Sequence, residues 1–279
     1  MKSVRPHFGT LVEVRVDDAR DPNQATGAAF AAIARVERLM SCHDPASELS
    51  RLNREAHLNP VQVDPWTYEV LRLSLEFFRA SDGLFDCAIG ARQVATERLP
   101  ARSRDACDAH ASSADIELVE PRHVRYRKRL YVDLGGIAKG FAVDRAIEAL
   151  RGAGARSGVV NAGGDLRAFG PQTEPVHVRL PANAGLVHVG ALREAAMATS
   201  ITDTDPPLGL PLLDPRGALK PAAQLVSVFA GDCVVADALT KVVALEREGV
   251  ARILERYGAR ALCWHAPAMR WEALAGTAS

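Results

Sequence analysis

Two adjacent glycines, Gly135 and Gly136, lie at the centre of the segment whose residue types are best suited to chemistry, LYVDLGGIAKGFAVDRAIEALRGAG at 130–154. The apolar run at 130–132 predicts a short strand, and after the glycines the apolar residues recur at the spacing of an amphipathic helix. Glycine adopts backbone conformations closed to other residues and lets a ligand approach the main chain. A glycine turn that opens a helix also leaves free N–H groups facing an anion, at the positive end of the helix dipole.

A carboxylate and an amine, from Asp133 and Lys139, lie on either side of this turn. The segment is therefore expected to hold a polar, phosphorylated small molecule. The alternative is that the glycines serve only tight packing between a strand and a helix. The sequence has no GxGxxG in its first strand–helix unit and no GxxxxGKS/T, so a Rossmann or P-loop site is not expected.

The composition is that of an ordinary globular protein. The 279 residues are 48% hydrophobic and 24% charged with a formal net charge of zero, which argues against non-specific binding to nucleic acid. The five cysteines are scattered without a CxxC pair, so neither a disulfide framework nor a zinc site is expected. No apolar run is long enough to span a membrane. We expect a cytoplasmic protein, or a periplasmic one if an export signal was trimmed from the chain.

The elements that must position the glycine turn are mixed along the chain. Apolar patterns predict strands at 11–16, 116–118, 124–132, 159–169 (with a bend), 176–180, 186–189, 191–199, 226–229 and 261–265, and helices at 25–40, 49–55, 66–81, 137–150, 234–246 and 249–257. Asp64 and Pro65 are expected to cap the helix at 66–81. Because strands and helices do not alternate regularly, an α+β fold is favoured over a doubly wound α/β fold. No linker divides the sequence, so we expect one domain over residues 1–279.

Eight separated motifs stand in one order along almost the whole sequence. They are HFGT at 7–10, SCHDPASELSRLN at 41–53, DGLFD at 82–86, DLGGIAKGFAVD at 133–144, VVNAGGDLRAFG at 159–170, ATS at 198–200, LLDPRG at 212–217 and DCVVADALT at 232–240. This series resembles the ApbE-like FAD:protein FMN transferase family. The resemblance implies a mixed α+β, T-fold-like domain with largely antiparallel sheets packed against helices.

The resemblance also implies an activity. The family binds FAD and, with Mg²⁺, transfers the FMN half to a serine or threonine hydroxyl of an acceptor flavoprotein, with AMP as the leaving group. Such phosphoryl chemistry depends on positioning and on charge neutralisation. Two other functions stay open: a non-catalytic protein that binds or carries FAD, and a slow FAD pyrophosphatase that produces FMN and AMP.

Carried over by position, the resemblance assigns most of the expected FAD-binding residues to four motifs and the glycine turn. They are Phe8, His43, Leu84, Phe85, Asp86, Asp133, Lys139 and Leu213. His43 stands where an aromatic residue usually packs on the isoalloxazine, and the alternative for it is an exposed loop histidine. Gly163, Gly164 and Asp165 are expected to form the wall beside the adenine or the pyrophosphate, with a simple glycine bulge between two strands as the alternative.

The metal ligands implied by the resemblance are the carbonyl of Gly136 and two side chains of a late helix, Asp237 and Thr240. The family has its threonine four residues after the aspartate, where this sequence has Lys241. One hypothesis is that the Lys241 ammonium pairs with Asp237 and replaces part of the cation's charge. The other is that Lys241 extends to solvent while Thr240 supplies the oxygen.

Two further positions differ from the family. Pro211 takes the place of a histidine, and proline can neither shuttle a proton nor donate a hydrogen bond. Ile201 takes the place of a glycine after ATS. Asp237 and Lys241 are the expected catalytic residues. The presence of Lys241 and Pro211 favours the non-catalytic protein that binds or carries FAD.

Overall fold

The computed structural model describes residues 1–95, 107–108, 110–180, 185–201, 214–215, 225–246, 249–265 and 270–275. The chain divides into two compact units. The first comprises Met1–Arg35, Lys139–Leu212 and Lys220–Ser279, and the second comprises Val36–Ala138 and Leu213–Leu219. The expectation of one domain over the whole chain stays a prediction.

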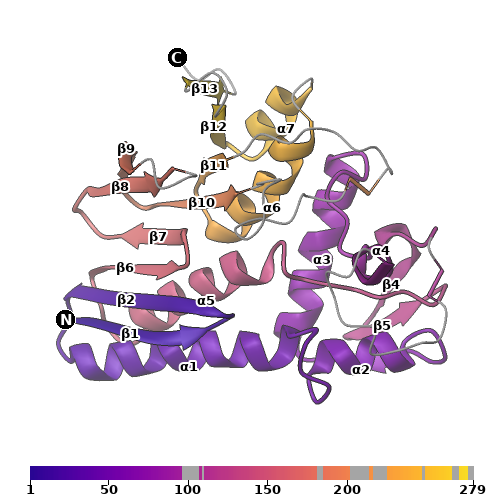
Figure 1. Cartoon of the computed structure of the whole chain (residues 1–279). Coiled ribbons are helices and arrows are strands. Elements are labelled where there is room, and N and C mark those ends of the chain that lie inside the picture. The colour runs from indigo at the N-terminus through magenta and orange to yellow at the C-terminus, as the bar shows by residue number, and fades with distance from the viewer. Residues whose placement is uncertain are drawn as a thin grey trace. The chain divides into compact units, whose positions relative to one another are not determined.

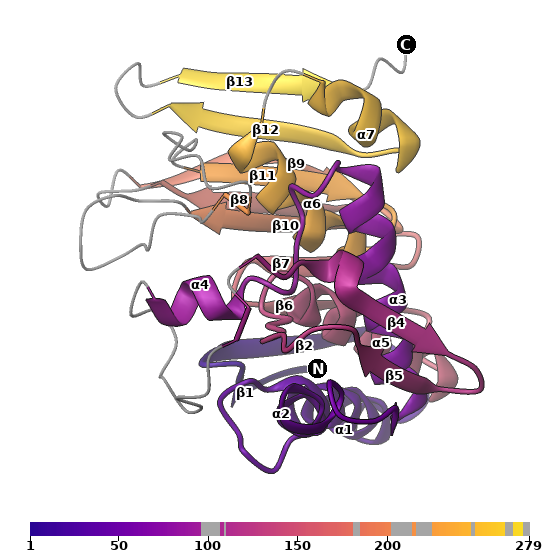
Figure 2. The same cartoon turned by 90° about the vertical axis from the view of Figure 1, so that its right-hand side faces the viewer.

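An eight-stranded sheet forms the centre of the first unit, with the order β1-β2-β6-β7-β10-β11-β12-β13. Its strands are β1 (Lys2–His7), β2 (Thr10–Asp18), β6 (Ser157–Ala162), β7 (Asp165–Phe169), β10 (Ala195–Ile201), β11 (Leu225–Ala230), β12 (Arg260–His265) and β13 (Arg270–Ala275). Every neighbouring pair is antiparallel. Figure 2 shows the strands one above another, from β1 and β2 to β12 and β13.

Helices pack on one face of this sheet, and a hairpin packs on the other. The helices are α1 (Pro22–Met40), which continues into the second unit, α5 (Ala138–Gly152), α6 (Cys233–Leu245) and α7 (Val250–Arg256). Strands β8 (Glu174–Arg179) and β9 (Leu186–Leu192) form a separate two-stranded sheet. Figure 1 shows α5 beside β6 and β7, and α6 beside β10.

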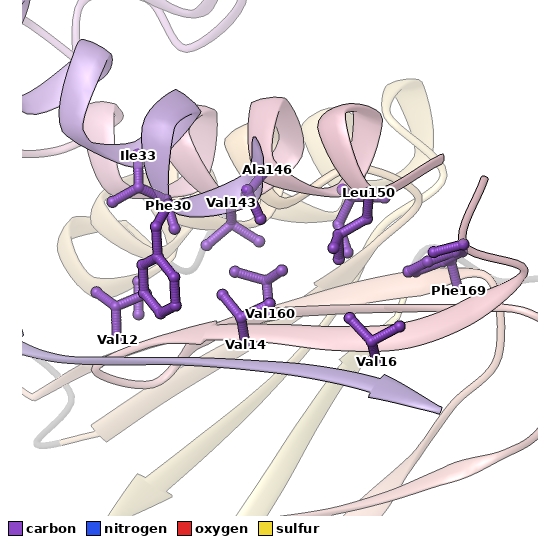
Figure 3. Close-up of a cluster of buried hydrophobic side chains, with 14 of the residues drawn as sticks. Val12, Val14, Val16, Phe30, Ile33, Val143, Ala146, Leu150, Val160 and Phe169 are labelled. Carbon is purple, nitrogen blue, oxygen red and sulfur yellow. The ribbon is translucent and has the colours of Figure 1, made fainter. Parts of the chain in front are cut away.

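Alternation along β2 explains which face receives the helices. Val12, Val14 and Val16 are buried in one cluster with α1 and α5 residues such as Phe30 and Leu150 (Figure 3). Successive side chains of a strand point to opposite faces, so the residues between the valines face away from this cluster. On the opposite face, apolar residues of β7 and β10 pack with residues of the β8–β9 hairpin.

The second unit is smaller and contains more helix than strand. Its elements are α2 (Glu48–Glu55), β3 (Val61–Gln62), α3 (Pro65–Ala80), α4 (Gly90–Ala95), a 3₁₀ turn at Ser113–Asp115, β4 (Ile116–Val119) and β5 (His123–Tyr126). The three strands form one sheet with the order β3-β5-β4. Asp64 caps α3, since its side chain accepts a hydrogen bond from the N–H of Trp66, as the sequence predicts.

The predicted α+β class is confirmed, and the structure corrects some of its details. Residues 130–132 are not a strand, and β5 ends at Tyr126. The segments predicted as strands at 176–180 and 186–189 do not continue the main sheet, because β8 and β9 pair with each other in a separate two-stranded sheet. The edge strands β1 and β13 are additional to the prediction. In the described part of the chain no helix is both long and apolar enough to cross a membrane.

Candidate functional site

The glycine turn of the second unit is shaped by Asp133. Its Oδ1 atom accepts a hydrogen bond from the N–H of Gly135 at 2.9 Å, and its Oδ2 atom accepts one from Nε2 of Gln93 at 2.9 Å. An aspartate that accepts from the N–H two residues ahead forms an Asx turn. Asp133 therefore fixes the backbone conformation of the turn that leads through Gly136 to the start of α5.

Side-chain and loop hydrogen bonds hold the segment before this turn in place of the hydrogen bonds of a neighbouring strand. The side chain of Asn53 imitates a neighbouring strand, because its Nδ2 donates to the carbonyl of Val132 at 2.9 Å and its Oδ1 accepts from the N–H of Val132 at 2.8 Å. The N–H of Asp133 donates to the carbonyl of Cys87 at 2.8 Å. Asn53 was not among the residues predicted from the sequence, although it ends the motif at 41–53.

The predicted flavin contacts in the turn at 84–86 also organise the second unit. Oδ1 of Asp86 accepts hydrogen bonds from the N–H of Ala88 at 2.8 Å and from the N–H and Oγ of Ser113 at 3.0 and 2.6 Å. Leu84 and Phe85 are buried, and the Phe85 ring packs edge-on against Phe77. These residues build the turn, and their contact with flavin stays a prediction.

A second group of predicted residues meets in the first unit as a cluster of two lysines and two aspartates. We call Lys139, Asp165, Asp237 and Lys241 the charge cluster. Nζ of Lys139 forms an ion pair with Oδ2 of Asp165, and Nζ of Lys241 forms one with Oδ1 of Asp237. The Lys241–Asp237 ion pair is the contact that one of the two hypotheses for Lys241 expects, and the role of this pair toward a ligand stays a prediction.

Burial divides the charge cluster into an inner and an outer layer. The aspartate side chains are 2% (Asp165) and 0% (Asp237) exposed, whereas the lysine side chains are 29% (Lys139) and 19% (Lys241) exposed. The carboxylates thus lie in the protein interior, and the lysine side chains are the members that are partly exposed.

Burial and mutual charge set the ionisation of the cluster. Burial lowers the pKa of Lys139, but the charges of Asp237 and Asp165 outweigh it and hold that pKa above its ordinary value. Burial and the charge of Asp237 raise the pKa of Asp165 to about 6 against the attraction of the lysines. Burial raises the pKa of Asp237, but Lys241 and Lys139 outweigh it, so that pKa is lowered. At neutral pH the cluster holds a charged Lys139 and an ionised Asp237.

Gly140 allows α5 and α6 to approach closely at this point. Its N–H donates to Oδ2 of Asp237 at 3.0 Å, and a Cβ at this position would lie 2.4 Å from the carbonyl oxygen of Cys233. A side chain here would therefore push α6 and Asp237 away from the start of α5.

A functional contact that the sequence analysis missed is made by Asp144 of α5, which caps α6. Its Oδ1 and Oδ2 accept hydrogen bonds from the N–H groups of Cys233 and Val234 at 2.9 and 2.8 Å, and its Oδ1 also accepts from Nη1 of Arg167 at 2.7 Å. Asp232, which occupies the N-cap position of α6, makes no side-chain capping bond and pairs with Arg167 instead. A carboxylate satisfies free helix N–H groups and interacts favourably with the helix dipole. Asp144 thus positions α6 and with it Asp237.

The residues of α6 do not fit a divalent cation as they stand. Both Asp237 carboxylate oxygens are engaged, by the Lys241 ammonium and by the Gly140 N–H. The hydroxyl of Thr240 is buried, donates to the carbonyl of Asp237 at 2.7 Å and pairs with Oγ of Ser200 at 2.7 Å. A charged ammonium cannot ligate a metal and repels one. Within the described residues, no group of three or more His, Cys, Asp or Glu side chains could hold a metal ion.

Gly163 and Gly164 form the two-residue turn of the β6–β7 hairpin. Both have positive φ, 65° and 104°, as a tight turn of this kind requires. A Cβ on Gly163 would lie 2.8 Å from Oγ1 of Thr10, so this turn packs closely against the start of β2. The glycines also line a cavity of about 280 Å³, together with Asn161 and Thr199. The hairpin turn accounts for the glycines, and their contact with adenine or pyrophosphate stays a prediction.

The remaining predicted residues are dispersed. Phe8 has a positive φ of 52° in the turn between β1 and β2, and it packs partly buried against the sheet core. His43 is exposed in its loop, where its N–H donates to Oγ of Ser41 at 3.2 Å. Ile201 is exposed at the end of β10. Pro211 and Leu213 lie outside the described residues.

The fold and the site define an antiparallel α+β protein with a lysine–aspartate cluster at the start of a helix, a setting that suits an anionic ligand. The particular family is shown by sequence. The chain belongs to the ApbE family, whose sequence model matches residues 8–263.

Curated proteins with similar sequences share the name FAD:protein FMN transferase. The chain is 28% identical over 218 residues to a protein from Treponema pallidum named FAD:protein FMN transferase, covering 70% of this chain and 60% of that relative. It is 29% identical over 283 residues to a protein of the same name from Rhodobacter capsulatus, covering 91% of this chain and 53% of that relative. The chain thus spans less than two thirds of the length of these relatives.

Solved structures agree on the fold. The ApbE protein of Thermotoga maritima superposes with a TM-score of 0.80 at 24% identity, over 98% of this chain and 96% of that one. The flavinyl transferase ApbE of Pseudomonas stutzeri, in its apo form, superposes with a TM-score of 0.82 at 19% identity, over 100% and 97% of the two chains. The likeness confirms the ApbE-like fold.

Proposed function

We propose that this protein transfers FMN from FAD to a serine or threonine hydroxyl of an acceptor flavoprotein and releases AMP. The family membership and the names of the relatives support this activity. The charge cluster is the single observation that links this activity to particular residues. Its two partly exposed side chains, Lys139 and Lys241, place ammonium groups beside the start of α5. Ammonium groups at a helix N-terminus suit the diphosphate of FAD.

The proposed reaction is a phosphoryl-type displacement. The acceptor oxygen forms a bond to the phosphorus of the FMN half, and the bond from that phosphorus to the bridging oxygen of the diphosphate breaks. AMP leaves with the bridging oxygen, and the hydroxyl proton passes to solvent. Lys139 and Lys241 neutralise the charge that develops on the leaving phosphate.

Asp237 has a positioning role in this proposal. Its lowered pKa and its two engaged oxygens make it a weak proton acceptor, so we assign it the task of holding Lys241 and the start of α5 in place. Asp133 and Gly136 shape the turn that precedes α5. Since the residues of α6 do not fit Mg²⁺, no step of the proposed reaction runs through a metal.

The compartment belongs to the proposal as well. The five cysteines are scattered along the sequence without a CxxC pair. This pattern fits a reducing compartment better than it fits a disulfide framework. This favours the cytoplasm for the protein and its acceptor.

The test is product analysis after incubation of the chain with FAD and an apo acceptor flavoprotein. We expect flavin fluorescence that stays on the acceptor band after denaturation, with one AMP released per flavin attached. Free FMN with AMP would indicate a pyrophosphatase, and unchanged FAD would indicate a binding protein. Either outcome would contradict the proposal.

Matched lysine variants give this test its control. Lys139→Met removes a cluster ammonium and should lower transfer by about a hundredfold. Lys2→Met removes an exposed lysine of the same unit, which pairs with Glu13 on the surface, and should leave transfer unchanged.

A further inference from the structure

We propose that the ammonium groups of Lys139 and Lys241 bind the diphosphate of FAD directly and that the site works without a divalent cation. The inference rests on the proposed function, because it takes FAD as the ligand. It adds the means by which the charge of the diphosphate is neutralised.

The two ammonium groups of the charge cluster have more hydrogen-bond donors than the described residues use. An ammonium group carries three N–H donors. In the part of the chain that the structure describes, Lys241 uses two of them, on Oδ1 and the carbonyl of Asp237, and Lys139 uses one, on Asp165. Three N–H groups on two partly exposed side chains therefore remain for a ligand. A donor set without acceptors of its own selects an anion.

The two ammonium groups are held in place by ion pairs before a ligand binds. Each is held by a carboxylate that is almost completely buried, and Asp237 is itself held by the N–H of Gly140. Because the lysine side chains are already ordered, little rotamer freedom is lost on binding. This is the arrangement expected of a binding site, and an exposed lysine without such support would not provide it.

A divalent cation on α6 would have to compete with Lys241 and Gly140 for the Asp237 carboxylate. A cation on α6 would need the Asp237 carboxylate, whose two oxygens are taken by Lys241 and Gly140. The Thr240 hydroxyl is taken as well, by the carbonyl of Asp237 and by Ser200. The Lys241 ammonium thus occupies the position from which a cation would neutralise the ligand, and its charge excludes a second cation nearby.

Calorimetric titration of the full chain with FAD, and separately with ADP, tests the inference. The titrations are made in excess Mg²⁺ and again in EDTA. We expect the two dissociation constants of each ligand to agree within about twofold. Weakening of about tenfold or more in EDTA, or no binding of either ligand in EDTA, would overturn the inference.

The variant Lys241→Thr provides the reciprocal test. Without the ammonium, binding of ADP in EDTA should weaken by about tenfold, and Mg²⁺ should restore it because Asp237 and a hydroxyl one turn later can then share one ion. Lys2→Met should bind ADP as the native chain does. Unchanged binding by Lys241→Thr in EDTA, or a weakening that Mg²⁺ does not relieve, would contradict the inference.

Two further measurements separate the possible failures. Lys241→Arg keeps the positive charge, and it should bind ADP equally in Mg²⁺ and EDTA, which guards against a misfolded threonine variant. Metal-free FAD binding without covalent flavin on the acceptor would contradict the proposed function and support this inference. Covalent transfer that requires Mg²⁺ for FAD binding would support the function and overturn the inference.

Discussion

Single residues of the charge cluster owe their chemistry to their surroundings more than to their type. Asp165 and Asp237 are both buried aspartates, yet the pKa of Asp165 rises to about 6 whereas that of Asp237 is lowered. Desolvation raises the pKa of both aspartates. At Asp237 the charges of Lys241 and Lys139 and the Gly140 N–H outweigh it, whereas at Asp165 the negative charge of Asp237 adds to it. The two aspartates therefore have pKa values shifted in opposite directions, a pattern that is common at functional sites.

The raised pKa of Asp165 predicts how stability depends on pH. Between about pH 4 and 6 the folded chain binds a proton at Asp165 more readily than the unfolded chain does. The contribution of this carboxyl to stability therefore falls as pH rises through that window, by on the order of 3 kcal/mol. Asp165→Asn removes the proton site, so the native chain should lose stability relative to the variant between pH 4 and pH 7.

Urea unfolding of both proteins at several pH values measures this difference. The exposed Asp18, which pairs with Arg156 on the surface, supplies the control variant Asp18→Asn. The stability difference between this control and the native chain should change little over the same range. A difference between native chain and Asp165→Asn that is flat from pH 4 to pH 7 would show that the Asp165 pKa is not raised.

At the scale of elements, the contact between α5 and α6 decides where the chemistry lies. Gly140 allows the close approach, and Asp144, one helical turn further along α5, caps α6 from its side. The cap of α6 is thus provided by a residue almost 90 positions away in sequence. Because the hydrogen bonds to Asp144 hold α6 against α5, the Asp237 side chain contacts the first turn of α5 at Gly140.

Replacement of Asp144 by asparagine tests this role. The variant removes the charge that faces Arg167 and weakens the bonds to the start of α6, and we expect a loss of about 3 kcal/mol of unfolding free energy. Asp232→Asn is the matched control, since Asp232 is largely exposed and makes no capping bond, and it should cost less than about 1 kcal/mol. Denaturant unfolding gives both values. Equal losses would show that Asp144 does not cap α6.

At the scale of the whole molecule, the chain passes between its two units more than once. The division falls within α1, between Arg35 and Val36, and within α5, between Ala138 and Lys139. A helix that begins in one unit and ends in the other has hydrogen bonds that neither unit completes alone. We therefore propose that the chain unfolds as one domain.

Scanning calorimetry tests this proposal. One cooperative transition is expected, with equal calorimetric and van't Hoff enthalpies. Phe30→Ala, which leaves a cavity in the core between α1 and β2, should lower the midpoint of that single transition through a loss of about 3 to 5 kcal/mol. A variant in which one transition moves while a second stays in place would contradict it.

Most of the elements could be predicted from sequence because their signals are local. The alternation of Val12, Val14 and Val16 predicts a strand with one buried face, and the Asp64-Pro65 pair predicts the start of α3. The glycine turn before α5 was predictable for the same reason. The prediction at 130–132 was wrong because an extended apolar run does not reveal its hydrogen-bond partners, and here Asn53 supplies them in place of a strand.

The sequence by itself determined the fold class, the family and the residue types available for anion binding, since these follow from periodicity and from motifs within short segments. The i, i+4 spacing makes the Lys241–Asp237 pair possible within one helix. Only the tertiary structure decided that the Gly140 N–H donates to the other Asp237 oxygen, that Ser200 pairs with Thr240, and that Asp144 caps α6. Each of these contacts depends on groups from distant segments competing for the same few polar atoms. Such competition is settled by which atoms come within hydrogen-bond distance when the chain folds, and no local pattern encodes it.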